Sequence, residues 1–247
     1  MQSDTLRPDT DRLWEASVKV RHLVGMFAIV GAIGLGTAVP TSAESTNLVT
    51  NGDFETPIAP PPPASPANII SVSGSQLDGW TIEGSGVMDV TNKNFSDNGS
   101  TVFPVFSGNQ SLDLNSLDPA TMTQDLTTVA GSTYHVFFAL SGVPPVPQGE
   151  CPHGSVLDKA LTVSAGTTSH DYTFSPDPSA TPPNNQAFAT KEFDFVATGT
   201  TTTLTFESTT SGCAGPIIDA VSVTLVPPAP PETPAAQPIA AAPAFTG

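Results

Sequence analysis

Cationic side chains are scarce in this sequence. Its 247 residues include 7 Lys and Arg against 23 Asp and Glu, which gives a net charge of −16. Only Lys93, Lys159 and Lys191 follow residue 43, against 19 acidic residues, so that part alone also carries −16. Such an acidic surface repels phosphate groups, which disfavours nucleic acid and anionic membranes as partners. It suits divalent cations and neutral polysaccharides, and solubility in a salty or extracellular setting explains it equally well.

Catalytic motifs are also missing. The sequence has no G-x-S-x-G elbow, H-E-x-x-H pair, phosphate-binding loop or C-x-x-C pair. The histidines after residue 43 are His135, His153 and His170, and none lies in such a motif. We therefore expect no catalytic residue. A hydrolase would need Ser, His and Asp to converge from distant parts of the chain.

The one long hydrophobic run lies near the N-terminus, from Leu23 to Val39. Basic residues precede it and the small residues Thr41–Ala43 follow it, an order typical of a secretory signal peptide. We expect residues 1–43 to be removed, which leaves a secreted or cell-surface chain with no stable membrane insertion. A retained membrane anchor is the alternative, since the run approaches the length that spans a bilayer.

Cysteine occurs only twice, at Cys151 and Cys213. In an exported chain an isolated pair usually forms a disulfide. Closing so long a loop would stabilise the fold by roughly 4 kcal/mol in the chain-entropy model. A thiol nucleophile is the alternative, but neither cysteine has a local motif that suggests activation.

Large apolar side chains become rare from residue 226, where the sequence reads VPPAPPETPAAQPIAAAPAFTG. A segment so rich in proline and alanine cannot bury a core. We therefore expect residues 226–247 to form a disordered, partly polyproline-II tail. A shorter proline run, Pro57–Pro66, indicates an extended surface loop.

Helical patterns are absent from the remaining domain, which we place at residues 44–225. Short runs that alternate apolar and polar residues recur between turn residues instead. In STYHVFFALSG, for example, Tyr134, Val136 and Phe138 share one face. We expect Trp80 and Tyr134 in the core. Eight to ten such strands predict an all-β fold, a β-sandwich in which two half-apolar sheets pair.

Carboxylates at the two ends of the domain suggest a metal site. Asp53 and Glu55 lie two apart on an expected short strand, so both would point the same way. Asp219 lies in the apolar stretch GPIIDAVSV, where burial without a counter-charge is costly. First and last strands of a sandwich are often neighbours, which would bring Asp219 close to Glu55. Since calcium takes several oxygen ligands, we expect it at Asp53, Glu55, Asp113 and Asp219.

Two alternatives to the metal site stay open. Asp219 can cap a bulge or accept hydrogen bonds from backbone amides, and Asp53 can simply face water.

Seven motifs in order resemble the choice-of-anchor C family, which is related to the domain of unknown function 642. They span Asn47 to Leu225 and read NLVTNGDFETP, DGWTI, GNQSLDLN, TMTQDLTTVAGSTYHVFFALSG, KALTVSAG, TTTLTFESTTSG and GPIIDAVSVTL. The resemblance implies a galactose-binding-like jelly-roll sandwich, export, surface attachment and carbohydrate association without catalysis. It also implies a structural calcium between the early N-G-x-F-E segment and the late Asp, which match Glu55 and Asp219.

The sequence departs from this family where aromatic residues are concerned. Tryptophans that the resemblance implies near Phe95 and Phe188 are missing, and neutral sugars stack on such aromatic faces. Where the late family motif reads L-D-N-V, this sequence has IDAV at Ile218–Val221 and so lacks the asparagine. No anchoring segment is visible either.

The leading hypothesis is a secreted, non-catalytic sandwich that binds a polysaccharide or cell-wall glycan. Loop side chains are the candidate contacts, and they could equally cover the open end of the sandwich: Asn94, Phe95, Asn98, Phe103 and Phe106. A structural or adhesive surface protein without a small-molecule site is the second hypothesis, and a hydrolase the third. An exposed aromatic cluster would favour glycan binding over the structural role.

Overall fold

The computed structural model describes residues 46–61, 68–97, 101–102, 104–145, 151–180 and 186–229. The expected signal peptide and all of the tail beyond residue 229 lie outside these ranges. In them the chain forms thirteen strands: β1 Ile69–Val72, β2 Thr81–Ile82, β3 Met88–Asn92, β4 Ser96–Asp97, β5 Thr101–Val102, β6 Gln110–Asp113, β7 Thr121–Thr127, β8 Thr133–Gly142, β9 Lys159–Ala165, β10 Thr168–Phe174, β11 Ala189–Val196, β12 Thr201–Ser208 and β13 Pro216–Leu225. No helix in the described ranges has the length and apolar character that crossing a bilayer requires.

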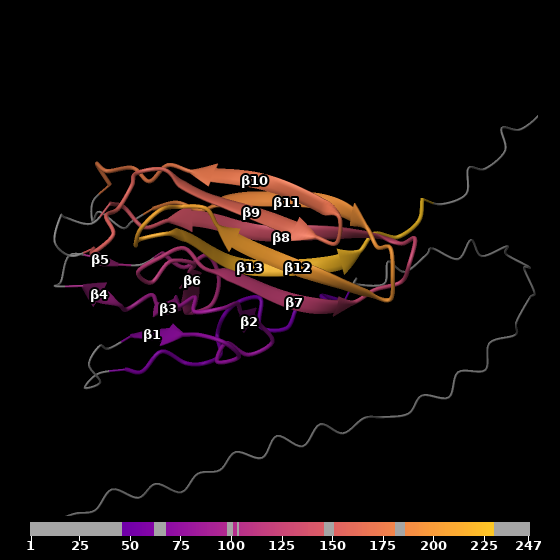
Figure 1. Cartoon of the computed structure of the whole chain (residues 1–247), viewed down its shortest axis with the longest axis horizontal. Helices are drawn as coiled ribbons and strands as arrows, with labels where there is room; N and C mark the ends of the chain where they lie inside the picture. Colours follow the sequence, from indigo (N-terminus) through magenta and orange to yellow (C-terminus); the bar gives the residue numbers. More distant parts are fainter. Residues whose placement is uncertain are drawn as a thin grey trace, which may run out of the picture. The chain divides into compact units, whose positions relative to one another are not determined.

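Two antiparallel sheets stack face to face (Figure 1). One has the order β1-β3-β6-β13-β8-β11 and the other the order β10-β9-β12-β7-β2, while β4 and β5 form a separate ribbon. From β6 to β13 the chain crosses between the sheets at every step except the β9–β10 hairpin. This order is that of a jelly roll. The predicted all-β sandwich is confirmed.

Alternating side chains build the core between the sheets. Trp80 and Tyr134 are 2% and 3% exposed, which confirms both as core residues. Phe138 lies at the centre, with ring centroids 5.2 Å from Tyr172 and 5.3 Å from Phe206, both edge-on. Edge-on aromatic pairs add to the free energy of burial. The core therefore fixes which face of each strand points outward.

The outward face of the five-stranded sheet carries hydroxyl groups. Thr81 pairs with Thr123, Thr123 with Thr205, and Thr205 with Ser164, so one row of hydroxyl side chains crosses four strands. Adjacent rows add Asp125 and further threonines. This face offers hydrogen bonds but no aromatic ring on its described strands.

The segment before β1 corrects one prediction. The expected short strand through Asp53 and Glu55 does not form, because Phe54 takes φ +54° and turns its ring into the core, where it is fully buried. The chain instead docks against β13: the Val221 N–H donates to the Gly52 carbonyl at 2.8 Å. A Cβ at Gly52 would lie 2.0 Å from the Val221 carbonyl oxygen, so only glycine permits this approach.

A bulge interrupts β13 beside this contact. The register with β8 shifts between Asp219 and Ser222, and Ala220 takes φ +52°. Bulges re-aim side chains and often lie beside functional sites. Here the bulge follows Asp219 directly, so the residue singled out in the sequence lies where the strand changes register.

The two cysteines form the expected disulfide, which is confirmed between Cys151 and Cys213. It packs in a small second core with Val143, Ala214 and Ile217. This cluster ties the loop after β8 to the loop before β13. The disulfide thus fastens one end of the sandwich.

Candidate functional site

Two carboxylates hold one loop, residues 104–109. Glu55 Oε1 accepts hydrogen bonds from the backbone N–H groups of Asn109 at 2.5 Å and Gln110 at 2.9 Å. Asp219 Oδ2 accepts from the N–H groups of Phe106 at 2.8 Å and Ser107 at 2.9 Å. Hydrogen bonds to charged acceptors are stronger than neutral ones. The loop is thereby held at its middle and where it enters β6.

Asp219 is fully buried, and its environment shows in its pKa. The pKa of Asp219 is raised to about 6, chiefly by burial and to a smaller extent by the nearby Glu55 charge, while the N–H groups of Ser107, Phe106 and Ala220 act in the opposite direction. Gly108 fits between these anchors because a Cβ there would lie 2.2 Å from Glu55 Oε1. Five backbone N–H groups in all satisfy the two carboxylates.

An aromatic cluster lies where this loop crosses the outward face of the six-stranded sheet. The ring centroid of Phe106 is 6.4 Å from that of Phe137 on β8 and 5.6 Å from that of Phe188, just before β11. Phe106 is 45% exposed, and the other two are partly buried. We call these three residues the phenylalanine platform.

Polar groups border the platform along β8 and β11. Glu192 is the direct cross-strand neighbour of Phe137, and Asp194 that of His135. His135 Nδ1 lies 2.7 Å from Asp194 Oδ1, and its Nε2 lies 3.5 Å from Glu192 Oε2. All three polar side chains are at least a third exposed. The platform therefore combines an exposed ring with hydrogen-bonding groups.

The other predicted ligand contacts separate. Asn94 is exposed and its carbonyl accepts a hydrogen bond from Asn68 Nδ2, while Phe95 is partly buried. Asn98 and Phe103 lie outside the described residues. Among the predicted loop residues that the structure describes, Phe106 joins the cluster.

The four predicted metal ligands do not all lie at one place in the structure. Glu55 and Asp219 meet at the same loop, as the sequence suggested. Asp53 is exposed and lines a different hollow with Asn47 and Ala220. In the described ranges no three His, Cys, Asp or Glu residues gather as metal ligands would.

Asp113 belongs to a separate buried polar cluster. Its Oδ1 accepts the N–H groups of Asn115 at 2.9 Å and Gly215 at 3.1 Å, and its strand neighbour is Asp89. Burial raises the pKa of Asp113 well above its ordinary value, with Asp89 adding to the shift.

Lys159 is also fully buried, and its charge interacts with that of Asp113. Burial lowers the pKa of Lys159 to about 8.

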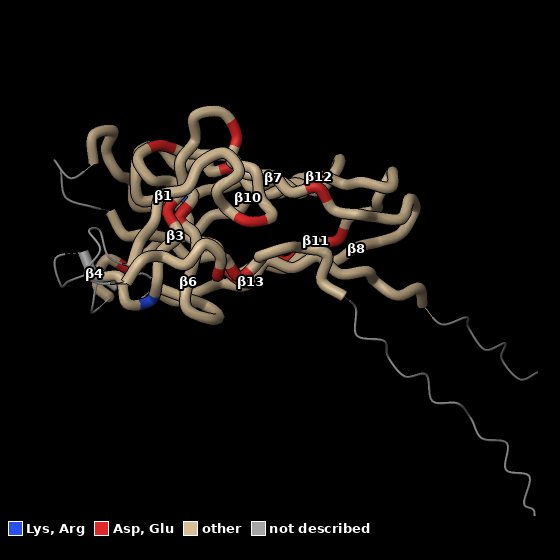
Figure 2. The backbone as a smooth tube through the Cα atoms, turned by 90° about the horizontal axis from the view of Figure 1, so that it is seen from below, with Lys and Arg blue, Asp and Glu red and all other residues tan. Residues whose placement is uncertain are grey.

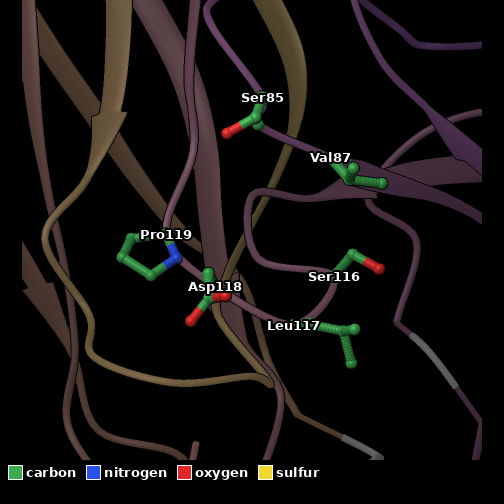
Figure 3. Close-up of a pocket in the computed structure, with 7 residues that line it drawn as sticks. Ser85, Val87, Ser116, Leu117, Asp118 and Pro119 are labelled. Carbon is green, nitrogen blue, oxygen red and sulfur yellow. The ribbon is translucent and has the colours of Figure 1, made fainter.

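A surface hollow of about 350 Å³ lies elsewhere, between the segment before β3 and the loop after β6 (Figure 3). Ser85, Ser116 and Asp118 line it, and His153 Nδ1 lies 2.6 Å from Asp118 Oδ1. The His153 and Asp118 side chains are 57% and 59% exposed. A catalytic triad relies on a buried Asp to orient the His, so this pair does not favour a hydrolase.

A family model described as a protein of unknown function, DUF642, matches residues 47–224. The chain belongs to the DUF642 family. The match covers every described strand up to β13, so the sandwich and both carboxylate anchors lie within it. The nearer resemblance to the choice-of-anchor C family stays a prediction.

Among known proteins, this DUF642 chain is similar to halomucin of Haloquadratum walsbyi, with 26% identity over 205 residues. The alignment covers 80% of this chain and 2% of halomucin, so the chain spans a small fraction of that protein's length.

Solved structures similar to the DUF642 chain include carbohydrate-binding modules. A family 16 module shares 14% identity, over 72% of this chain and 99% of the module, with a TM-score of 0.40. The xylan-binding domain CBM22-1 of Xyn10C from Paenibacillus barcinonensis shares 16% identity, over 64% and 93%, with a TM-score of 0.37.

Sequence reasoning missed two members of the platform. Phe137 was visible as an outward position, because it alternates with the core residues Val136 and Phe138. Phe188 stood where the family resemblance implied a tryptophan. The missing information was the path of residues 104–109, which sets Phe106 against both rings, and no local pattern encodes that path.

Proposed function

We propose that this DUF642 protein is a non-catalytic, extracellular module that binds a glycan on the phenylalanine platform. The observation that carries the proposal is the exposed ring of Phe106, set on a loop that Glu55 and Asp219 hold in place. The disulfide supports an extracellular location, since disulfides persist in oxidising compartments.

The platform has the physical properties that sugar recognition requires. A pyranose ring presents a C–H face that stacks on an aromatic ring, and its hydroxyl groups need hydrogen-bond partners at the edge. Phe106 supplies the ring, while His135, Glu192 and Asp194 supply the edge. Because the loop is held by four backbone hydrogen bonds, little conformational entropy is lost on binding.

The opposite sheet is a poorer candidate. Its outward positions on the described strands are threonine, serine, aspartate and glutamate, with one alanine. Hydroxyl groups alone compete weakly with water for a sugar, because they offer no apolar face to stack on. The second hypothesis, a structural or adhesive protein, would leave the platform without a ligand.

Calcium at Glu55 and Asp219 remains part of the proposal. Their carboxylates are the hard oxygen donors that calcium prefers. The Glu55 charge raises the pKa of Asp219, and a cation between the two carboxylates would offset the repulsion that causes this rise. The N–H groups around them also satisfy the pair without a cation. When bound, calcium would supply neutralising charge and would stiffen the loop that carries Phe106.

The first test is a pull-down of the purified domain with a panel of insoluble polysaccharides. We expect retention on at least one neutral polysaccharide and its loss in Phe106→Ala. Leu117→Ala is the matched control, since Leu117 is 53% exposed but lines the hollow of Figure 3 instead. Retention by neither the wild type nor any variant would reject glycan binding in favour of the structural role.

A further inference from the structure

The charges around the phenylalanine platform are of one sign. Glu192 lies directly opposite Phe137, and Asp194 opposite His135, on the outward face of β8 and β11. Cross-strand neighbours on one face lie about 5 Å apart. A glycan stacked on the platform would therefore lie beside two exposed carboxylates.

These carboxylates keep acceptor capacity. His135 engages Asp194 Oδ1 and Glu192 Oε2. The other oxygen of each carboxylate has no partner among the described residues. Each acid can thus accept a hydrogen bond from a ligand without losing its contact with His135.

No lysine or arginine on the described part of this face balances them, and the imidazole of His135, which lies between them, carries a positive charge only when it is protonated. Lys191 lies on the opposite side of β11, with its Nζ 5.9 Å from the centroid of the Tyr172 ring. Lys159 is fully buried, and Lys93 lies beside Asn109, at the Glu55 end of the loop. Figure 2 shows how few blue positions the described chain has and how many red ones. At physiological ionic strength, fields from exposed charges reach about 8 Å, so the nearest charges dominate.

We infer that the platform selects glycans whose sugars carry protonated amines, such as a glucosamine polymer, over neutral ones, and excludes polyuronates. The inference rests on the proposed function, because the same rings bind the sugar. Glu192 and Asp194 are the specificity-determining residues. The ammonium groups of such a glycan donate hydrogen bonds to the carboxylates of Glu192 and Asp194. The carboxylates of a polyuronate are repelled by these two side chains, because both carry negative charge.

The test compares three soluble oligosaccharides at one pH of about 7, at which an amine with an ordinary pKa is still mostly protonated: a glucosamine oligomer, its N-acetylated counterpart and a galacturonate oligomer. We expect the amine-bearing ligand to bind roughly threefold to tenfold more tightly than the neutral one, as two exposed ion pairs would give. The excess should shrink when the salt rises from about 20 mM to about 200 mM. The galacturonate should not bind detectably.

Variants separate this inference from the proposed function. Glu192→Gln with Asp194→Asn should remove the preference for the amine, so that the amine-bearing and the neutral ligand bind this variant with equal affinity. Glu207→Gln, an exposed acid on the other sheet, is the control and should change neither. Equal affinity for amine and neutral ligands, or binding of the uronate, overturns the inference while glycan binding stands. Binding of none of the three, with no polysaccharide retained in the pull-down, overturns both.

Discussion

Glu55 and Asp219 lie 164 positions apart in the sequence and both accept backbone hydrogen bonds from a single loop, residues 104–109. Asp219 accepts the N–H groups of Phe106 and Ser107 at the middle of the loop, and Glu55 accepts those of Asn109 and Gln110, where the loop enters β6. The relationship links the fold to the proposed function, because the loop carries the one exposed ring of the platform.

Removing the Glu55 carboxylate should loosen this loop. Glu55→Ala leaves two N–H groups without their acceptor, so we expect a loss of about 1–2 kcal/mol in the free energy of unfolding and weaker glycan binding. Urea unfolding and a binding titration measure the two effects. Glu207→Ala removes an exposed carboxylate from the other sheet and should change neither.

Chelation tests the calcium proposal at the same residues. A cation bound only to the folded state raises the unfolding midpoint by mass action. We expect excess chelator to lower the midpoint of the wild type, and not that of Asp219→Asn. An unchanged wild-type midpoint would show that backbone amides alone satisfy the pair.

The disulfide should contribute strongly to stability. Its cysteines are 62 residues apart, for which the chain-entropy model gives about 4 kcal/mol. Cys151→Ser with Cys213→Ser should lower the free energy of unfolding by that order while the far-ultraviolet circular dichroism keeps its β signature. A change of less than about 1 kcal/mol would contradict the model.

Asp113 is expected to reduce stability at neutral pH. Its raised pKa means that the folded state holds the proton more tightly, so stability should fall as the pH rises above about 4. Asp113→Asn keeps an oxygen acceptor and removes the like charge opposite Asp89, so it should stabilise the protein at pH 7. Asp113→Ala should cost about 2–4 kcal/mol, because two buried N–H groups lose their acceptor. Urea unfolding at several pH values distinguishes the two.

Lys159 should produce the opposite slope at alkaline pH. Its pKa falls from 10.5 in the unfolded chain to about 8 in the fold, so the unfolded state binds more protons between these values. Stability should therefore rise from pH 8 towards pH 10.5. Lys159→Met should flatten this rise, and the exposed Lys93→Met should leave it intact. A slope that survives in Lys159→Met would refute the assignment.

Local patterns predicted most of the sandwich, since alternation decides which face is buried. The core positions of Trp80 and Tyr134 followed from the strand patterns, and the pairing of Cys151 with Cys213 followed from their being the two cysteines of an expected exported chain. The strand expected through Asp53 and Glu55 did not form, because Phe54 gains more from burial at a positive φ than an extended chain would give.

The candidate site was only partly predictable. The sequence predicted that Glu55 and Asp219 lie close together, because the first and last segments of a sandwich are often neighbours. It predicted Phe106 as a ligand contact, because Phe106 lies in a loop. Asp113 was assigned to the same site because sequence shows which residues are acidic but not which strand neighbours they meet. Phe137 and Phe188 depended on a loop path that only tertiary contacts fix.

The most direct measurement is the affinity of the domain for the glycan that the pull-down retains, by calorimetric titration of the wild type and Phe106→Ala. We expect at least a tenfold loss of affinity in Phe106→Ala, equivalent to about 1.4 kcal/mol, with the unfolding midpoint unchanged. Leu117→Ala should bind as the wild type does. Equal affinity of the wild type and Phe106→Ala would show that the ligand binds somewhere other than the phenylalanine platform.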